Sequence, residues 1–122
     1  MATPRASSFS TRKCRPCEGG TPPLGREQVI LYLKEVPGWK LSADEKSIFV
    51  EYVMKDFLSA IDLINRVAKV AEAEDHHPDI HLSGYRKLRI ELSTHSIGGL
   101  SENDLILAAK INPLPKKLKF SV

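Results

Sequence analysis

The sequence contains no apolar stretch long enough to cross a lipid bilayer. A membrane-spanning helix needs about 18 consecutive apolar residues or more, and no run among these 122 residues approaches that length. The N-terminus also lacks the apolar core of a secretory signal. The composition, 42% hydrophobic and 27% charged, is typical of a globular protein. We therefore expect one domain, in the cytoplasm, that folds without disulfide bonds.

Cysteine is scarce. The only two, Cys14 and Cys17, form a single Cys-x-x-Cys motif. A zinc ribbon or knuckle would need two further ligands at matching spacing. A thioredoxin-like redox pair would follow a strand and open a helix, whereas Pro16 and the Gly19-Gly20 pair predict a loop. We expect thiols without a catalytic role, in a reducing compartment.

Acidic residues are absent before Glu18, and four of the eight prolines lie in the first 23 residues. We interpret residues 1–23 as a flexible, basic leader, although its composition also faintly resembles an organelle transit peptide. Residues 113–122 form a basic C-terminal tail with three lysines and no acid. The domain between them, residues 24–112, has a mildly acidic balance, which argues against nucleic acid as a partner because such binding requires cations that neutralise phosphates.

Hydrophobic spacing predicts three helices and two hairpins. Helical spacing of apolar residues is found over residues 26–36, 57–75 and 102–111. Strands are predicted at 39–41, 48–54, 80–82 and 85–94. Asp56 is a good N-cap for the central helix, and Ser101 with Asp104 resembles a capping box at the start of the last helix.

The connections between these strands are too short for parallel crossovers, so the strands must be antiparallel. The predicted fold class is α+β. It has a four-stranded antiparallel sheet with three helices packed on one face, in the order α-β-β-α-β-β-α.

Histidine is absent from most of the chain, yet all four histidines lie within 20 residues: His76, His77, His81 and His95. The first two fall at the exit of the central helix, where the helix dipole favours a protonated imidazole. Glu72 lies four residues before His76, so its carboxylate is expected on the same helical face, able to orient that ring. His95 closes the last strand and could return to the same cleft. Together these residues predict an acid–base site.

Simpler interpretations remain open. The two histidines at the helix exit could have a purely structural role, in which they cap the last free carbonyls of the helix. The cluster, with its neighbouring carboxylates, could instead bind zinc, but the spacing lacks a His-x-x-x-His pair and we expect no metal. Three further residues have simple structural interpretations: Trp39 in the core, His81 on the surface and Asp104 in the capping box.

Residues 72–104 contain an ordered set of motifs. An acid precedes a His-His-Pro, and an aromatic residue, a Ser-Thr-His and an aspartate follow. These are, in order, Glu72, His76-His77-Pro78, Tyr85, Ser93-Thr94-His95 and Asp104, with Gly38-Trp39-Lys40-Leu41 upstream. Together they resemble the signature of the pterin-4a-carbinolamine dehydratase family, and the resemblance covers about residues 25 to 112.

The resemblance implies an α+β fold and a hydro-lyase that dehydrates a 4a-hydroxytetrahydropterin to the quinonoid dihydropterin, with no cofactor. In the family this step recycles tetrahydrobiopterin. The catalytic positions of the family fall on His76, His77 and His95. The residues predicted to bind substrate are Glu72, Asp75, Pro78, Trp39, Ser93 and Thr94. Because imidazoles titrate near pH ~6.5, we hypothesise that His76 and His95 exchange protons at the C4a hydroxyl and N5.

The resemblance also bears on partners. It implies a small-molecule pterin as substrate and self-association as a homodimer or homotetramer. From the charge balance and the lack of long apolar runs, we expect neither nucleic acid nor a membrane as a partner. A folate-type or molybdopterin-linked substrate is an alternative within the enzyme class. A non-catalytic interaction module is an alternative outside it, because animal members also act as dimerisation cofactors for a transcription factor.

Overall fold

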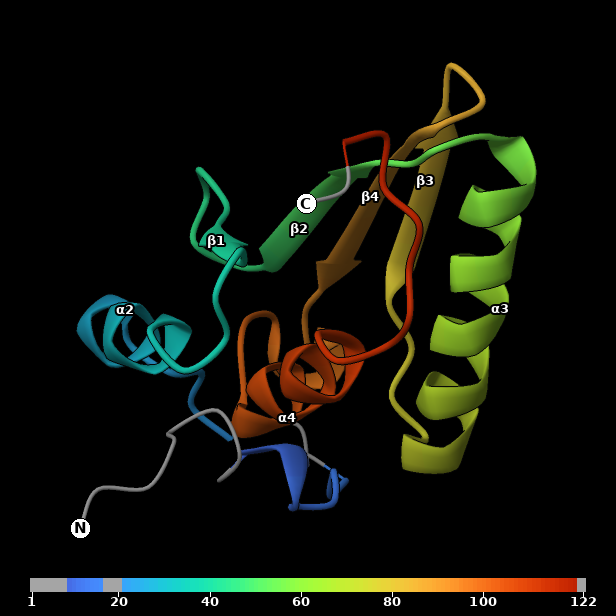
Figure 1. Cartoon of the computed structure of the whole chain (residues 1–122). Helices are drawn as coiled ribbons and strands as arrows, with labels where there is room; N and C mark the ends of the chain where they lie inside the picture. Colours follow the sequence, from blue (N-terminus) through green and yellow to red (C-terminus); the bar gives the residue numbers. More distant parts are fainter. Residues whose placement is uncertain (1–8, 17–20, 121–122) are drawn as a thin grey trace, which may run out of the picture.

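A computed structural model of the chain describes residues 9–16 and 21–120 (Figure 1). Its elements are, in chain order, α2 (Arg26–Leu33), β1 (Lys40–Leu41), β2 (Ile48–Val53), α3 (Phe57–Glu74), β3 (Asp79–Ser83), β4 (Lys87–Leu92), the short 3₁₀ helix η1 (His95–Ile97) and α4 (Glu102–Ile111). The predicted α+β class and the predicted order of helices and strands are confirmed.

The four strands form one antiparallel sheet in the order β1-β2-β4-β3. Near its centre, Ile90 of β4 lies opposite Val50 of β2 on one side and Ile80 of β3 on the other. Because side chains alternate between the two faces of a strand, this register collects the apolar residues of three strands on one face. We call it the inner face, and the helices lie against it (Figure 1).

The hydrophobic core lies between the inner face and the helices. Ile48, Ile90 and Leu92 of the sheet are fully buried, as are Leu63 of α3 and Leu107 of α4. The alternate residues, among them Glu51, His81 and Lys87, are exposed on the outer face. Among the described residues no helix is both long and apolar enough to cross a membrane.

The ends of the helices follow the predicted capping chemistry. The Asp56 side chain accepts a hydrogen bond from the Ser59 amide at the start of α3, and α3 ends at Asp75, whose left-handed conformation (φ 52°) turns the chain. Ser101 and Asp104 form the predicted capping box of α4. The first helix is shorter than predicted and ends at Leu33, because residues 34–36 continue only as turns.

Both flanking segments contact the domain. In the leader, Phe9 is 2% exposed and its ring meets Tyr32 edge to face at 5.2 Å. In the tail, Leu118 forms an isolated antiparallel bridge with Met54, just beyond β2. The predicted domain boundaries therefore separate segments that differ in composition but pack together. Cys17 lies outside the described residues.

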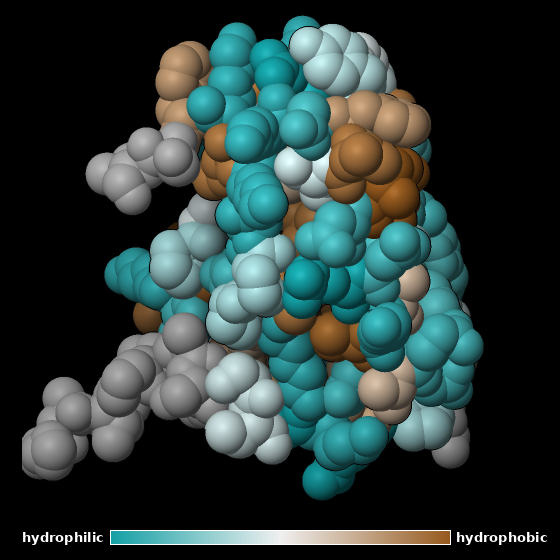
Figure 2. Space-filling model, turned by 45° about the vertical axis from the view of Figure 1, so that its right-hand side comes forward, coloured by the Kyte–Doolittle hydropathy of each residue, from teal (hydrophilic) through white to brown (hydrophobic). Residues whose placement is uncertain are grey.

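The surface on the α3 side is mostly hydrophilic, with hydrophobic side chains gathered toward the end where α3 begins (Figure 2). Phe57 and Leu58, in the first turn of α3, are 51% and 77% exposed. Val53, at the end of β2, is also exposed.

Candidate active site

A cavity of about 310 Å³ opens where α3, β4, α4 and the leader meet. Its lining comes from residues 74–77 at the exit of α3, residues 93–96 after β4, Asn103 in the first turn of α4, and residues 14–16 of the leader. Three of the four histidines, His76, His77 and His95, lie in this lining. The fold thus brings together residues that are distant in the sequence, as the acid–base interpretation requires.

His76 pairs with the buried carboxylate of Asp104. Its Nε2 lies 2.6 Å from Asp104 Oδ1, and the two side chains are 12% and 0% exposed. A carboxylate held against one ring nitrogen fixes the tautomer and orientation of the imidazole. His76 therefore has the environment of a general acid or base.

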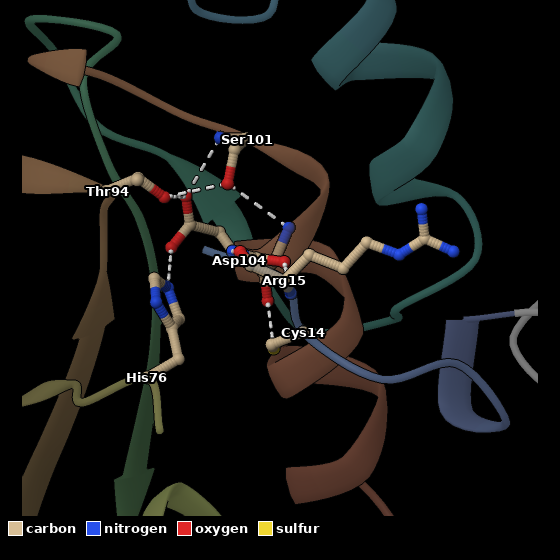
Figure 3. Close-up of polar contacts among 7 residues, drawn as sticks. Cys14, Arg15, His76, Thr94, Ser101 and Asp104 are labelled. Carbon is tan, nitrogen blue, oxygen red and sulfur yellow. Dashed lines mark hydrogen bonds and ion pairs between the residues drawn. The ribbon is translucent and has the colours of Figure 1, made fainter. Parts of the chain in front are cut away.

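Asp104 is itself held rigidly (Figure 3). Its second oxygen, Oδ2, accepts hydrogen bonds from the Thr94 hydroxyl at 2.9 Å and the Ser101 amide at 3.0 Å. The Thr94 and Ser101 hydroxyls lie 2.8 Å apart. One oxygen thus completes the capping box of α4 while the other orients His76, so the local fold of α4 positions the site.

His77 forms a second pair, at the surface. Its Nε2 lies 2.7 Å from Glu72 Oε1, and the side chains are 56% and 79% exposed. The expectation that Glu72 orients His76 is wrong. The left-handed turn at Asp75 breaks the helical spacing, so His77 meets Glu72 and His76 turns toward Asp104.

His95 lies across the cavity lining on η1, and its ring is exposed. Within the described part of the chain the His95 ring has no hydrogen-bond partner, in contrast to His76 and His77. The site therefore offers one imidazole held by a buried carboxylate and one that is open to a ligand.

The sequence profile of the family described as pterin 4 alpha carbinolamine dehydratase matches residues 22–114. The chain belongs to this family. The resemblance seen in the sequence is thereby confirmed, and family membership makes the chain an enzyme of the hydro-lyase class.

Individual relatives agree with this assignment. A protein of Halorhodospira halophila, provisionally named as a pterin-4-alpha-carbinolamine dehydratase, is 46% identical over 107 residues, which cover 88% of this chain and 97% of that protein. The Arabidopsis thaliana protein named pterin-4-alpha-carbinolamine dehydratase 2, mitochondrial, is 44% identical over 111 residues, 88% of this chain and 59% of that protein. The solved structure of a transcriptional coactivator/pterin dehydratase from Brucella melitensis matches with a TM-score of 0.69 and 30% identity, over 74% of this chain and 95% of that one.

The predicted substrate-binding residues divide into two groups. Asp75, Ser93 and Thr94 line the cavity with the histidines. Glu72, Pro78 and Trp39 are not part of the lining. Trp39 is 4% exposed within the core, and its indole Nε1 donates to Asn112 Oδ1 at 2.8 Å. The structure thus places Trp39 where the simpler interpretation did.

Two buried polar residues of the site were not predicted, Glu74 and Asn103. Glu74 accepts hydrogen bonds from Lys110 at 2.6 Å and from the Cys14 amide at 2.9 Å. Burial acts to raise the pKa of Glu74, but these two hydrogen bonds outweigh it and hold the pKa below its ordinary value. The sequence did contain a signal for Glu74, because it continues the helical spacing of the apolar residues that α3 buries.

Cys14 lines the cavity, and its thiol is inert by environment. Partial burial, together with the neighbouring carboxylate of Glu74, raises the pKa of Cys14 to about 12. The thiol is therefore protonated at neutral pH, and the thiolate is the reactive form of cysteine.

Among residues 9–16 and 21–120, no three His, Cys, Asp or Glu side chains are grouped to hold a metal ion.

Proposed function

We propose that this chain dehydrates a 4a-hydroxytetrahydropterin to the quinonoid dihydropterin by histidine acid–base catalysis. The hydroxyl on C4a accepts a proton and leaves as water, N5 loses its proton, and a double bond forms between C4a and N5. No electrons are exchanged with a second reactant. The observation that carries the proposal is the cavity in which His76, paired with buried Asp104, and unpaired His95 share one lining.

The two histidines suit opposite roles. Asp104 orients His76 and occupies its Nε2, which leaves Nδ1 to exchange a proton with the substrate. His95 has no competing hydrogen bond among the described residues, so it can exchange the second proton. Each positioned group of this kind typically contributes ~10²- to 10⁴-fold to the rate.

We propose that His77, Asp75 and Ser93 bind the pterin ring. All three line the cavity. Glu72 supports His77 from the surface. Thr94 contributes indirectly, because its hydroxyl binds Asp104 and its amide donates to the Gly99 carbonyl.

In the cell this reaction would regenerate a tetrahydropterin cofactor, and we place it in the recycling of tetrahydrobiopterin. The cytoplasm is the expected compartment. The name of the Arabidopsis thaliana relative refers to mitochondria, so an organelle reached through the basic leader is the alternative. We also expect the chain to work as a homodimer or homotetramer.

The test is stopped-flow absorbance of freshly generated 4a-hydroxytetrahydropterin as it decays to the quinonoid dihydropterin. Relative to the uncatalysed reaction, wild type accelerates the decay, and His76→Ala and His95→Ala each lower kcat by about 10²-fold. His81→Ala is the matched control, because this histidine is exposed on the outer face of the sheet. Full acceleration in His95→Ala, or an equal loss in His81→Ala, contradicts the proposal.

A second function is favoured by one observation: the Brucella melitensis protein of similar structure is named a transcriptional coactivator as well as a pterin dehydratase. An interaction module would use an outer surface rather than the histidines. The double variant His76→Ala/His95→Ala separates the two functions, because it abolishes dehydration and leaves a complex with a protein partner intact.

A further inference from the structure

A second cavity, of about 500 Å³, adjoins the histidine cavity. The two share Arg15, Pro16 and Asn103 in their linings. The two cavities therefore lie next to each other along these three residues. At about 310 Å³ the first cavity is at the lower limit of ligand pockets, ~300–1,000 Å³, so a long substituent must leave it.

The second cavity is basic. Its charged lining consists of Arg12, Lys13 and Arg15 from the leader and Glu102 from α4. Glu102 is already paired with Arg12. The lining therefore holds three cations against one carboxylate, and the Lys13 ammonium also donates to the Ala73 carbonyl at 3.4 Å. The guanidinium of Arg15 points away from His76 (Figure 3), and Arg15 lines the second cavity as well as the first.

The leader is fixed in place by contacts with main-chain atoms. Asn103 Oδ1 accepts from the Arg15 amide at 2.9 Å, and the Asn103 amide group donates to the Arg15 carbonyl. Glu74 accepts from the Cys14 amide. These contacts use the main chain of Cys14 and Arg15, so they are kept when the side chains of Lys13 and Arg15 are replaced. They also hold a segment outside residues 22–114, the part that the family profile matches.

We propose that the leader makes this chain selective for pterins with an anionic group, a carboxylate or a phosphate, on the C6 substituent, and that Lys13 and Arg15 bind that group. The inference rests on the proposed function, because it assumes a pterin ring among the histidines. Charge-assisted hydrogen bonds to carboxylate and phosphate are the strong class of polar contact, and arginine can bind either anion in a bidentate manner.

Binding of oxidised pterins, which cannot undergo the reaction, tests this without turnover. Neopterin and neopterin 3′-monophosphate share one side chain and differ only by the phosphate, and folic acid supplies the carboxylate arm. We expect the full chain to bind at least one anionic pterin about tenfold more tightly than neopterin by calorimetry. In Lys13→Gln/Arg15→Gln this preference falls to less than about twofold, and in wild type it weakens as salt rises.

Lys69→Gln is the matched control. This lysine is exposed on α3 and lines neither cavity, so the preference stays as in wild type. Equal binding of neutral and anionic pterins, or a preference that survives in Lys13→Gln/Arg15→Gln, overturns the inference and leaves the proposed function standing. Failure of wild type to bind any pterin overturns both.

Discussion

The two histidine–carboxylate pairs of the site differ in burial, and burial determines how strongly each carboxylate interacts with its histidine. Asp104 is fully buried, whereas Glu72 is 79% exposed. An exposed ion pair is screened by water and is worth ~0–1 kcal/mol. When a buried carboxylate is removed, water cannot take over its hydrogen bonds, so its partners are left unsatisfied.

We therefore expect Asp104→Asn to lower kcat by about 10²-fold, because an amide replaces the carboxylate that fixes the tautomer and orientation of His76. The amide oxygen can still accept from Thr94 and Ser101, so the free energy of unfolding falls by only about 1–2 kcal/mol. Stopped-flow rates and urea denaturation measure the two effects. Glu72→Gln is the comparison, and a loss there as large as in Asp104→Asn would contradict the ranking.

Replacing Trp39, a residue of the family signature, shows whether it stabilises the core or contacts the substrate. Its indole hydrogen bond to Asn112 is lost in Trp39→Phe, which we expect to lower the free energy of unfolding by about 1–3 kcal/mol. Because Trp39 does not line the cavity, KM stays within about twofold of wild type. A KM that rises tenfold in a folded variant would support the predicted role of Trp39 in substrate binding instead.

At the scale of elements, the junction of α3 and α4 is held by the pair Glu74–Lys110. We expect Glu74→Gln to lower the free energy of unfolding at pH 7 by about 1–3 kcal/mol, because Lys110 loses its ionic partner. The pKa of Glu74 lies below its ordinary value of 4.5. The stabilisation is therefore present above pH 4.5 and is lost as the pH falls through the lowered pKa.

Urea denaturation across this pH range measures the difference between wild type and Glu74→Gln, and the difference shrinks in acid. Glu102→Gln is the control, because its pair with Arg12 is exposed and costs less than about 1 kcal/mol to remove. A difference between wild type and Glu74→Gln that does not depend on pH would exclude the ionised form of Glu74 as the cause.

The elements themselves could be predicted from local patterns. The central helix, both of its neighbouring hairpins and the caps Asp56 and Ser101 depend on residues close in the sequence, and the structure confirms them. The pairing of His76 with Asp104 could not be predicted locally, since 28 residues separate them. The capping box accounted for one oxygen of Asp104, and the second oxygen, on a buried residue, was the clue to a further partner.

At the scale of the whole molecule, the exposed apolar side chains at the start of α3 bear on self-association. Phe57, Leu58 and Val53 are exposed there in the single chain. We expect sedimentation velocity to give a mass of two or four times 13.6 kDa. Leu58→Glu shifts the distribution toward one chain, because a charge placed in an apolar contact is costly, and Glu35→Gln, just after α2, leaves it unchanged. A wild type that sediments as a single chain would contradict the expectation.

The contact between the leader and α4 has a consequence for how the protein is made. Cys14 and its partner Asn103 are 89 residues apart. At synthesis rates of 5–20 residues per second, roughly 4–18 s separate the two positions on the ribosome. The leader is thus the first part of the site to be translated, and its contacts with α4 form only after residue 103 has been synthesised. The basic wall of the cavity can close only after α4 has been synthesised, so the enzyme acquires its full binding surface later than its first-made residues.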